Sequence, residues 1–133
     1  MSVTLVEGQA LEPRTFTITR ADLRAYAAAS GDHNPIHSDE QVARSVGLPG
    51  VIAHGMYTLG LVGRAVSGWT GGAEVVEVGC RFTKPVVVPA TGGVDVVVAG
   101  TVSTLTEGRA TLSLSVTCEG VKVLAMPKAV VVV

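Results

Sequence analysis

Side chains capable of acid–base chemistry are concentrated in residues 31–40, GDHNPIHSDE, of a chain that is 47% hydrophobic. Asp32 and His37 stand five residues apart, and the Asn34-Pro35 pair between them favours an extended corner over a helix. A carboxylate and an imidazole that converge on one water molecule can activate it and later return the proton. Asn34 could orient either partner through a hydrogen bond. The spacing is equally compatible with a solvated loop that caps itself, because Asn, Asp and Ser favour turns.

A second candidate group is Ala53-His54-Gly55, at the start of an apolar helix expected near residues 55–67. No Ser, Thr, Asp or Asn stands where the helix would begin, so its first backbone N–H groups lack a side-chain acceptor. A ligand oxygen could accept from them with the help of the helix dipole. The alternatives are a water molecule or a carbonyl of a neighbouring loop, with His54 a packed core histidine.

The two groups together favour one kind of chemistry. An acid–base pair beside unpaired helix N-terminal donors is what addition of water across a conjugated carbonyl requires. One side activates the water, and the other stabilises the enolate oxygen.

The elements that would position these residues follow from the pattern along the chain. Residues 14–19 alternate as a strand, and Thr19 with Asp22 forms a capping box before a helix over residues 21–30. Gly31 suits the helix C-terminus. A second short helix is expected to be capped by Ser38, with Gln41 completing the capping box, and to end at Gly47.

The helix near 55–67 is apolar on nearly all sides, which predicts a buried helix. Gly60 and Gly63 would be tolerated there if a sheet approached closely. Strands are expected over residues 75–84, 94–104, 110–119 and 121–133, with Pro127 at an edge or a bulge. The economical architecture is an α+β fold in which a curved antiparallel sheet wraps around one buried helix, as a single domain over residues 1–133.

The stretch SGDHNPIHSDEQVARSVGLPGVIAHGMYTLGL resembles the signature of the MaoC-like hydratase/dehydratase family, D-x-N-P-x-H followed by A-H-G. The resemblance implies a hot-dog fold. It implies reversible hydration of trans-2-enoyl thioesters to (3R)-3-hydroxyacyl thioesters, on CoA or an acyl carrier protein, in fatty-acid or related acyl-chain metabolism. A closer similarity is to the catalytic subunit of two-subunit 3-hydroxyacyl-carrier-protein dehydratases.

The same resemblance implies roles for individual residues. Asp32 and His37 would hold the catalytic water, and the Gly55 N–H would bind the thioester oxygen. Asn34 would orient the pair and His54 would have a supporting role. His33 fills the variable position of the motif and receives no role.

Three other kinds of protein are alternatives to this interpretation. A metal site could use Asp32, His33, His37 and His54, but their spacing matches no usual zinc pattern and no Cys joins them. A non-catalytic acyl-binding subunit would not need acid, base and glycine together. A thioesterase would need a group placed for acyl hydrolysis. No metal and no cofactor are therefore expected.

Composition bounds the remaining properties. The net charge of −1, with scattered basic residues, argues against nucleic-acid binding. No apolar stretch is long enough for a membrane span, and no leader is apparent, so a soluble, cytoplasmic protein is expected. Cys80 and Cys118 are expected to be reduced core thiols. Apolar residues on both faces of VDVVVAGTV and VLAMPKAVVVV predict a homodimer, or a heterodimer with a related hot-dog subunit.

Overall fold

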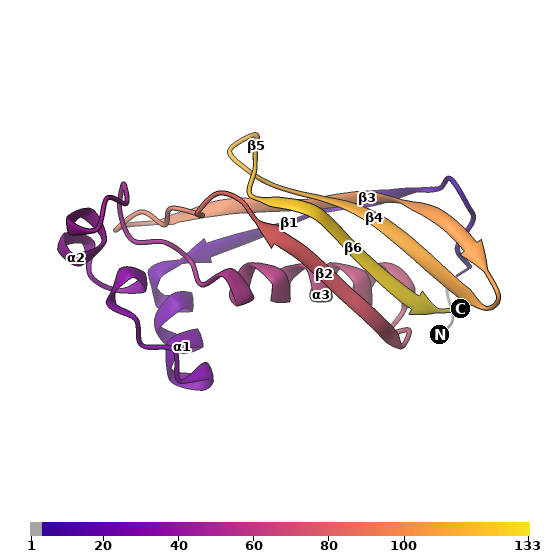
Figure 1. The fold of residues 1–133 in the computed structure, drawn as a ribbon, viewed down its shortest axis with the longest axis horizontal. Coiled ribbons are helices and arrows are strands. Elements are labelled where there is room, and N and C mark those ends of the chain that lie inside the picture. The colour runs from indigo at the N-terminus through magenta and orange to yellow at the C-terminus, as the bar shows by residue number, and fades with distance from the viewer. Residues whose placement is uncertain (1–3) are drawn as a thin grey trace.

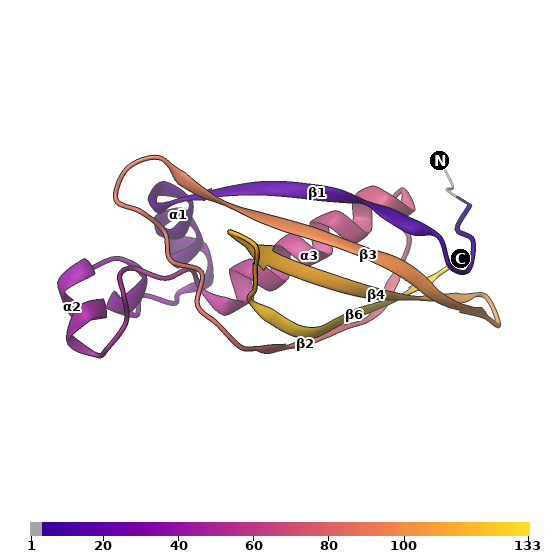
Figure 2. The same cartoon turned by 90° about the horizontal axis from the view of Figure 1, so that it is seen from above.

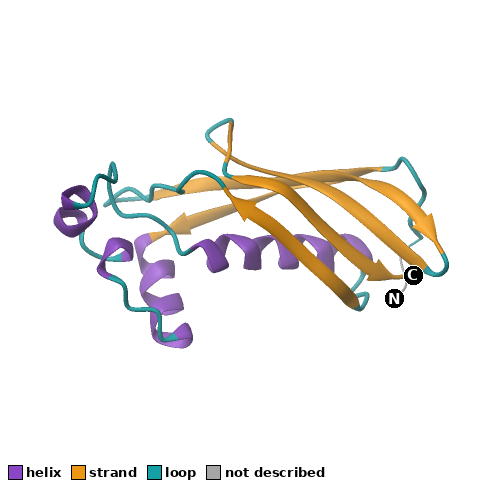
Figure 3. Ribbon diagram, viewed as in Figure 1, coloured by secondary structure: helices purple, strands orange, loops and turns teal. Residues whose placement is uncertain are grey.

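The computed structural model describes residues 4–133, and its elements follow the order predicted from the sequence (Figures 1 and 3). They are β1 (Ala10–Thr19), α1 (Arg20–Ser30), the 3-10 turn η1 (Pro35–His37), α2 (Glu40–Ser45), α3 (Gly55–Thr70), β2 (Val75–Phe82), β3 (Gly93–Thr106), β4 (Arg109–Cys118), β5 (Val121–Lys122) and β6 (Leu124–Val132). Most strand boundaries lie within a few residues of the prediction, the normal uncertainty of sequence patterns. The single strand expected over residues 121–133 is instead divided into β5 and β6.

One antiparallel sheet is wrapped around one helix. Its strands lie in the order β1-β3-β4-β6-β2, with β5 paired to β4, so β1 and β2 are the edges. Figure 2 shows α3 crossing beneath the sheet, and Figure 3 shows the helices gathered on one side of it. Val62 and Val66 of α3 pack in one core with Val96, Leu112 and Val131 of the strands, all 0–1% exposed. The α+β fold with a buried helix is confirmed.

The curvature of the sheet comes from irregular pairing. The register shifts between Leu11 and Arg14 in β1, and between Gly79 and Arg81 where β2 pairs β6. Such bulges bend a strand and increase its twist. Pro127 lies in β6 opposite the second shift, next to Met126 at φ 48°. Since β6 lies between β4 and β2, the proline occupies a bulge and not a sheet edge.

The predicted capping residues of α1 are confirmed, but the predicted N-cap of α2 is wrong. Thr19 and Asp22 form the reciprocal capping box, and Gly31 ends α1 in the left-handed region at φ 79°. The cap of α2 is Asp39, whose carboxylate accepts from the Val42 N–H at 3.1 Å, and not Ser38. The 3-10 turn extends the corner through His37, so the helix begins one residue later than expected.

The expectations for the glycines of α3 and for the two cysteines have different outcomes. Nothing lies within 4 Å of a Cβ built on Gly60 or Gly63, so the idea that a sheet approaches α3 at these glycines is wrong. Cys80 and Cys118 are free thiols as predicted, but only Cys118 is buried in the core, while Cys80 is half-buried against it. Burial raises the pKa of each thiol. Within residues 4–133, no helix combines the length and hydropathy needed to cross a bilayer.

Candidate active site

The candidate site lies at the N-terminal end of α3, where α1, η1 and α2 gather beyond the end of the helix (Figure 1). Backbone hydrogen bonds assemble its framework. The Ala53 N–H donates to Val86 O and the Val88 N–H to Val51 O, both at 2.9 Å. The Ile52 N–H donates to the Ile36 carbonyl at 3.2 Å, which ties this segment to η1. Three parts of the chain therefore meet just before α3 begins.

His37 is the last residue of η1, and a backbone carbonyl outside the turn holds its ring. Its Nδ1 lies 2.7 Å from the Ile52 carbonyl oxygen. A carbonyl can only accept, so Nδ1 carries the hydrogen and Nε2 keeps its lone pair. The His37 side chain is half-buried and lines the main cavity. Its free nitrogen is thus suited to accept a proton from water.

Asp32 faces the same region from the other side of the corner. It follows Gly31 directly, and its Oδ1 accepts from the Asn34 N–H at 3.2 Å. The Asn34 side chain accepts from the Ile36 N–H at 3.2 Å, so it caps η1 and makes no bond to either acid–base side chain. Asn34 therefore orders the turn that presents His37. This support differs from the expected hydrogen bond of its side chain to Asp32 or His37.

His54 is a packed histidine at the centre of the group, with 2% of its surface exposed. Its Nε2 lies 3.1 Å from the Asp32 carbonyl oxygen. Its ring stacks on that of His37, with centroids 3.9 Å apart and planes 23° apart. Tyr26 packs edge-on against its ring at 4.8 Å.

Asp32, His37 and His54 offer polar atoms within 4.8 Å of one another, close enough to consider a metal ion. Ring nitrogens direct their lone pairs within the plane of the ring. Two stacked, nearly parallel rings therefore aim them side by side and not at one point, which does not suit the tetrahedral coordination of zinc. The geometry favours a water-binding site over a shared metal site.

The start of α3 has the uncapped donors predicted from the sequence. His54 occupies the N-cap position and makes no side-chain capping bond. Within residues 4–133, no protein acceptor lies in hydrogen-bonding position for the backbone N–H groups of Gly55 and Met56. Both residues line the main cavity. The positive end of the helix dipole therefore faces a space that a ligand oxygen could enter.

Phe82, at the end of β2, is the closest neighbour of Gly55 across the cavity. A Cβ built on Gly55 would lie 3.0 Å from Cε1 of Phe82, closer than ordinary van der Waals contact. The phenyl side chain is nevertheless 55% exposed, so it can move. Glycine at this position leaves room for an aromatic ring beside the start of α3.

The cavity itself has a volume of about 730 Å³, in the range of small-molecule sites. Its wall is mostly apolar and is shared between the α1–α3 region and residues 82–86, with Val123 and Leu124 paired beside the latter. The sequence patterns did not single out Tyr26, Thr58 or Phe82, which also line it. No local signal marks them, because each resembles an ordinary core or strand residue. His33 instead lines a separate, smaller cavity of about 150 Å³.

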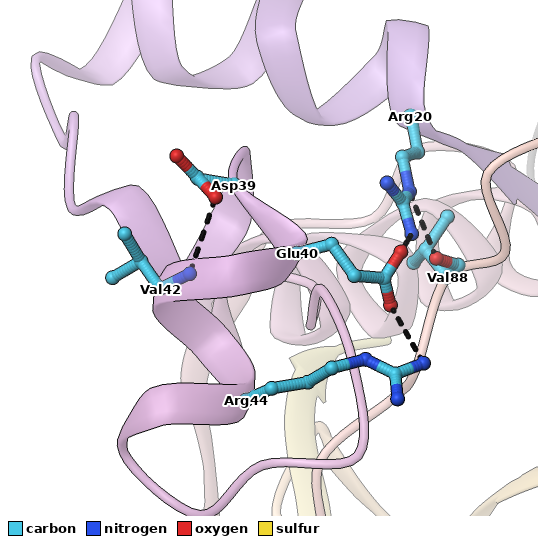
Figure 4. Close-up of polar contacts among 6 residues, drawn as sticks. All are labelled: Arg20, Asp39, Glu40, Val42, Arg44 and Val88. Carbon is cyan, nitrogen blue, oxygen red and sulfur yellow. Dashed lines mark hydrogen bonds and ion pairs between the residues drawn. The ribbon is translucent and has the colours of Figure 1, made fainter.

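An ion-pair cluster holds the outer side of the site together (Figure 4). Arg20 donates to the Glu40 carboxylate at 2.7 Å and to the Val88 carbonyl at 3.0 Å. Arg44 lies 3.6 Å from the other Glu40 oxygen. The Arg20 hydrogen bond, with smaller contributions from the charges of Arg20 and Arg44, lowers the pKa of Glu40. The cluster thereby joins the start of α1 to α2 and to Val88, two residues beyond the cavity-lining Val86.

Comparison with known proteins places these residues in a family context. Residues 3–128 match the model of the MaoC like domain family. The 3-hydroxyacyl-thioester dehydratase X of Mycobacterium tuberculosis is 47% identical over 76 residues, which cover 57% of this chain and 26% of that protein. A solved structure described as a MaoC-like dehydratase superposes with a TM-score of 0.90 at 34% identity, over 96% of this chain and 40% of that one.

A third relative is matched over most of its length. The R-hydratase PhaJ1 from Pseudomonas aeruginosa, solved without ligand, has a TM-score of 0.83 and 30% identity. The match covers 96% of this chain and 82% of that one. By contrast, the chain spans only about a quarter of the dehydratase X sequence. The family match extends over nearly the whole chain and includes both segments that build the site, so this protein belongs to the MaoC like domain family.

Proposed function

We propose that this chain catalyses the reversible hydration of trans-2-enoyl thioesters to 3-hydroxyacyl thioesters. The observation that supports it is the juxtaposition of Asp32 and His37 with the unpaired N–H of Gly55 in one largely apolar cavity. The cavity provides room for an acyl thioester, and its polar groups lie at the end where α3 begins.

In this mechanism a water molecule lies between the Asp32 carboxylate and Nε2 of His37. As the water oxygen bonds to C3 of the enoyl group, the pair accepts one proton, and a proton is returned to C2. The net change is addition of H and OH across the double bond. Negative charge that develops on the thioester oxygen is stabilised by the Gly55 N–H and the helix dipole. No cofactor or metal takes part.

The acyl carrier and the hand of the product are part of the proposal. The similarity to an R-hydratase and to a 3-hydroxyacyl-thioester dehydratase supports the 3R product and a thioester of CoA or an acyl carrier protein. Lys84 lines the cavity and is a candidate for contact with the phosphate of the carrier arm. We place the protein in the cytoplasm on the sequence features alone.

Residues 1–133 are proposed to act as one hot-dog unit that pairs with a second copy or a related subunit. The apolar surface that supports this lies on the edge strand β2, where Val75, Val76 and Val78 are 39–42% exposed. Strands β3 and β6, on which the prediction was based, largely bury their apolar residues within the chain. An edge strand exposed on both faces invites pairing with another chain.

The direct test follows the absorbance of a short trans-2-enoyl-CoA with purified protein, with and without EDTA, and resolves the product by chiral analysis. Loss of the conjugated thioester with formation of the 3R product, unaffected by EDTA, is expected. A free fatty acid as product would instead indicate a thioesterase. A 3S product or dependence on metal would contradict the mechanism.

A further inference from the structure

His54 has an atom that neither the fold nor the proposed chemistry explains. Its side chain is 98% buried, and Nδ1 is the one enclosed side-chain nitrogen or oxygen without a hydrogen-bond partner among residues 4–133. Buried polar atoms are rarely left unpaired, because losing water without gaining a partner costs folding free energy. A phenyl ring would fill the same space without that cost, so packing alone does not account for an imidazole.

The hydrogen bond made by the other nitrogen identifies the tautomer. The Asp32 carbonyl oxygen, 3.1 Å from Nε2, can only accept, so Nε2 carries the hydrogen and Nδ1 is the bare nitrogen. The imidazole is therefore used for its Nε2–H donor. That donor reaches the backbone of an otherwise exposed residue, directly beyond the end of α1.

The flat face of the His54 ring supports His37, the other member of the acid–base pair. It stacks on His37 at 3.9 Å, while Tyr26 packs edge-on against it at 4.8 Å and restricts its movement. His37 is also fixed through its Nδ1 by the Ile52 carbonyl. One buried side chain thus contacts both Asp32 and His37, by a hydrogen bond and by a ring face.

We propose that His54 is a positioning residue that sets the separation of the Asp32 carboxylate and the His37 imidazole. Its catalytic consequence rests on the proposed hydration. The Nε2–H holds the Asp32 backbone, and the ring face holds His37. Leaving Nδ1 unpaired lowers the stability of the fold, and this loss accompanies the placement of the donor. A displacement of about 1 Å in such a pair can cost about 10²-fold in rate.

Two substitutions separate the donor from the ring. His54→Phe keeps a flat ring against His37 and Tyr26, removes the donor to Asp32 and also removes the unpaired nitrogen. His54→Gln places an amide N–H near the position of Nε2 and removes the ring. For His54→Phe we expect a melting temperature at or above that of the wild type, with kcat reduced by about 10- to 10²-fold and KM little changed. For His54→Gln we expect a smaller loss of kcat.

Thr70→Val is the matched control at the other end of α3. Thr70 is also buried, and its hydroxyl donates to Val66 O at 2.8 Å and accepts from the Ala73 N–H at 3.2 Å. Removing it should lower the melting temperature and leave kcat unchanged. If His54 were only a core residue, His54→Phe would likewise keep the wild-type kcat, and that result would overturn the proposal.

Nuclear magnetic resonance tests the same inference without any turnover. Long-range ¹H–¹⁵N correlations should show His54 protonated at Nε2 and His37 protonated at Nδ1. His54→Phe should shift the Asp32 amide and His37 ring resonances, and Thr70→Val should not. A wild-type protein without hydratase activity would refute the proposed function and leave this test intact. His54 protonated at Nδ1, or His37 resonances unmoved by His54→Phe, would overturn the positioning role itself.

Discussion

Replacing Gly55 by proline removes one backbone hydrogen at the point where the thioester oxygen is proposed to bind. The structure indicates that the backbone accepts the change. Gly55 is the first residue of α3, where proline leaves no intrahelical bond unmade. The preceding His54 has φ −60° and ψ 135°, in the polyproline II region and outside the helical region that a following proline disfavours. The variant should therefore fold.

The expected loss follows from the donor removed. Loss of one oxyanion-hole donor typically lowers kcat by about 10²–10³-fold, or about 3–4 kcal/mol. A new Cβ at residue 55 would also meet the Phe82 ring at 3.0 Å. Gly55→Ala carries the same Cβ and keeps the N–H, so it is the matched control. Making both changes in a Phe82→Leu background removes the aromatic contact.

The assay is the initial rate of loss of enoyl-thioester absorbance, with circular dichroism as the test of folding. The initial rate of the Gly55→Pro variant should be about 10²–10³-fold lower than that of Gly55→Ala, both with the native Phe82 and with Phe82→Leu. Equal losses for the two variants would remove the Gly55 N–H from the mechanism. Equal losses that recover with Phe82→Leu would show that the glycine serves only to accommodate the phenyl ring.

Three further predictions test other parts of the structure. Asp32→Asn and His37→Ala should each lower kcat by at least about 10²-fold with a smaller effect on substrate binding, and a folded variant with near-normal kcat would exclude that residue from the pair. The folded-state pKa of Glu40 is lowered by Arg20, so its stabilising contribution is complete above the ordinary glutamate pKa of about 4.3 and is lost as pH falls through the lowered value. As pH decreases, the melting temperature should therefore fall less for Glu40→Gln than for the wild type. Parallel plots of melting temperature against pH for the two proteins would contradict this. Light scattering should show a dimer that Val78→Asp weakens, whereas a fully active wild-type monomer at micromolar concentration would exclude the proposed assembly.

Local sequence signals predicted the elements well where one short-range interaction decides them. The Thr19 capping box and the end of α1 at Gly31 each depend on a few neighbouring residues. The turns at residues 107–108 and 119–120 are both Glu-Gly pairs with positive φ at both positions, a conformation that glycine adopts readily. The cap of α2 was misplaced because Ser38 and Asp39 are both good N-caps. The preceding 3-10 turn, which sequence patterns do not define, uses Ser38 as its C-cap and leaves Asp39 as the N-cap of α2.

The sequence by itself determined the polar corner, the uncapped start of α3 and the alternation of strands, because these depend on residue type and spacing along the chain. Tertiary structure decided which groups meet. The stacking of His54 on His37, 17 residues apart in the chain, the approach of Phe82 to Gly55 and the bond from Arg20 to Val88 join distant segments. Such contacts depend on how bulges curve the sheet around α3 and on which side chains then compete for the same space. No pattern within a short window of sequence contains that information.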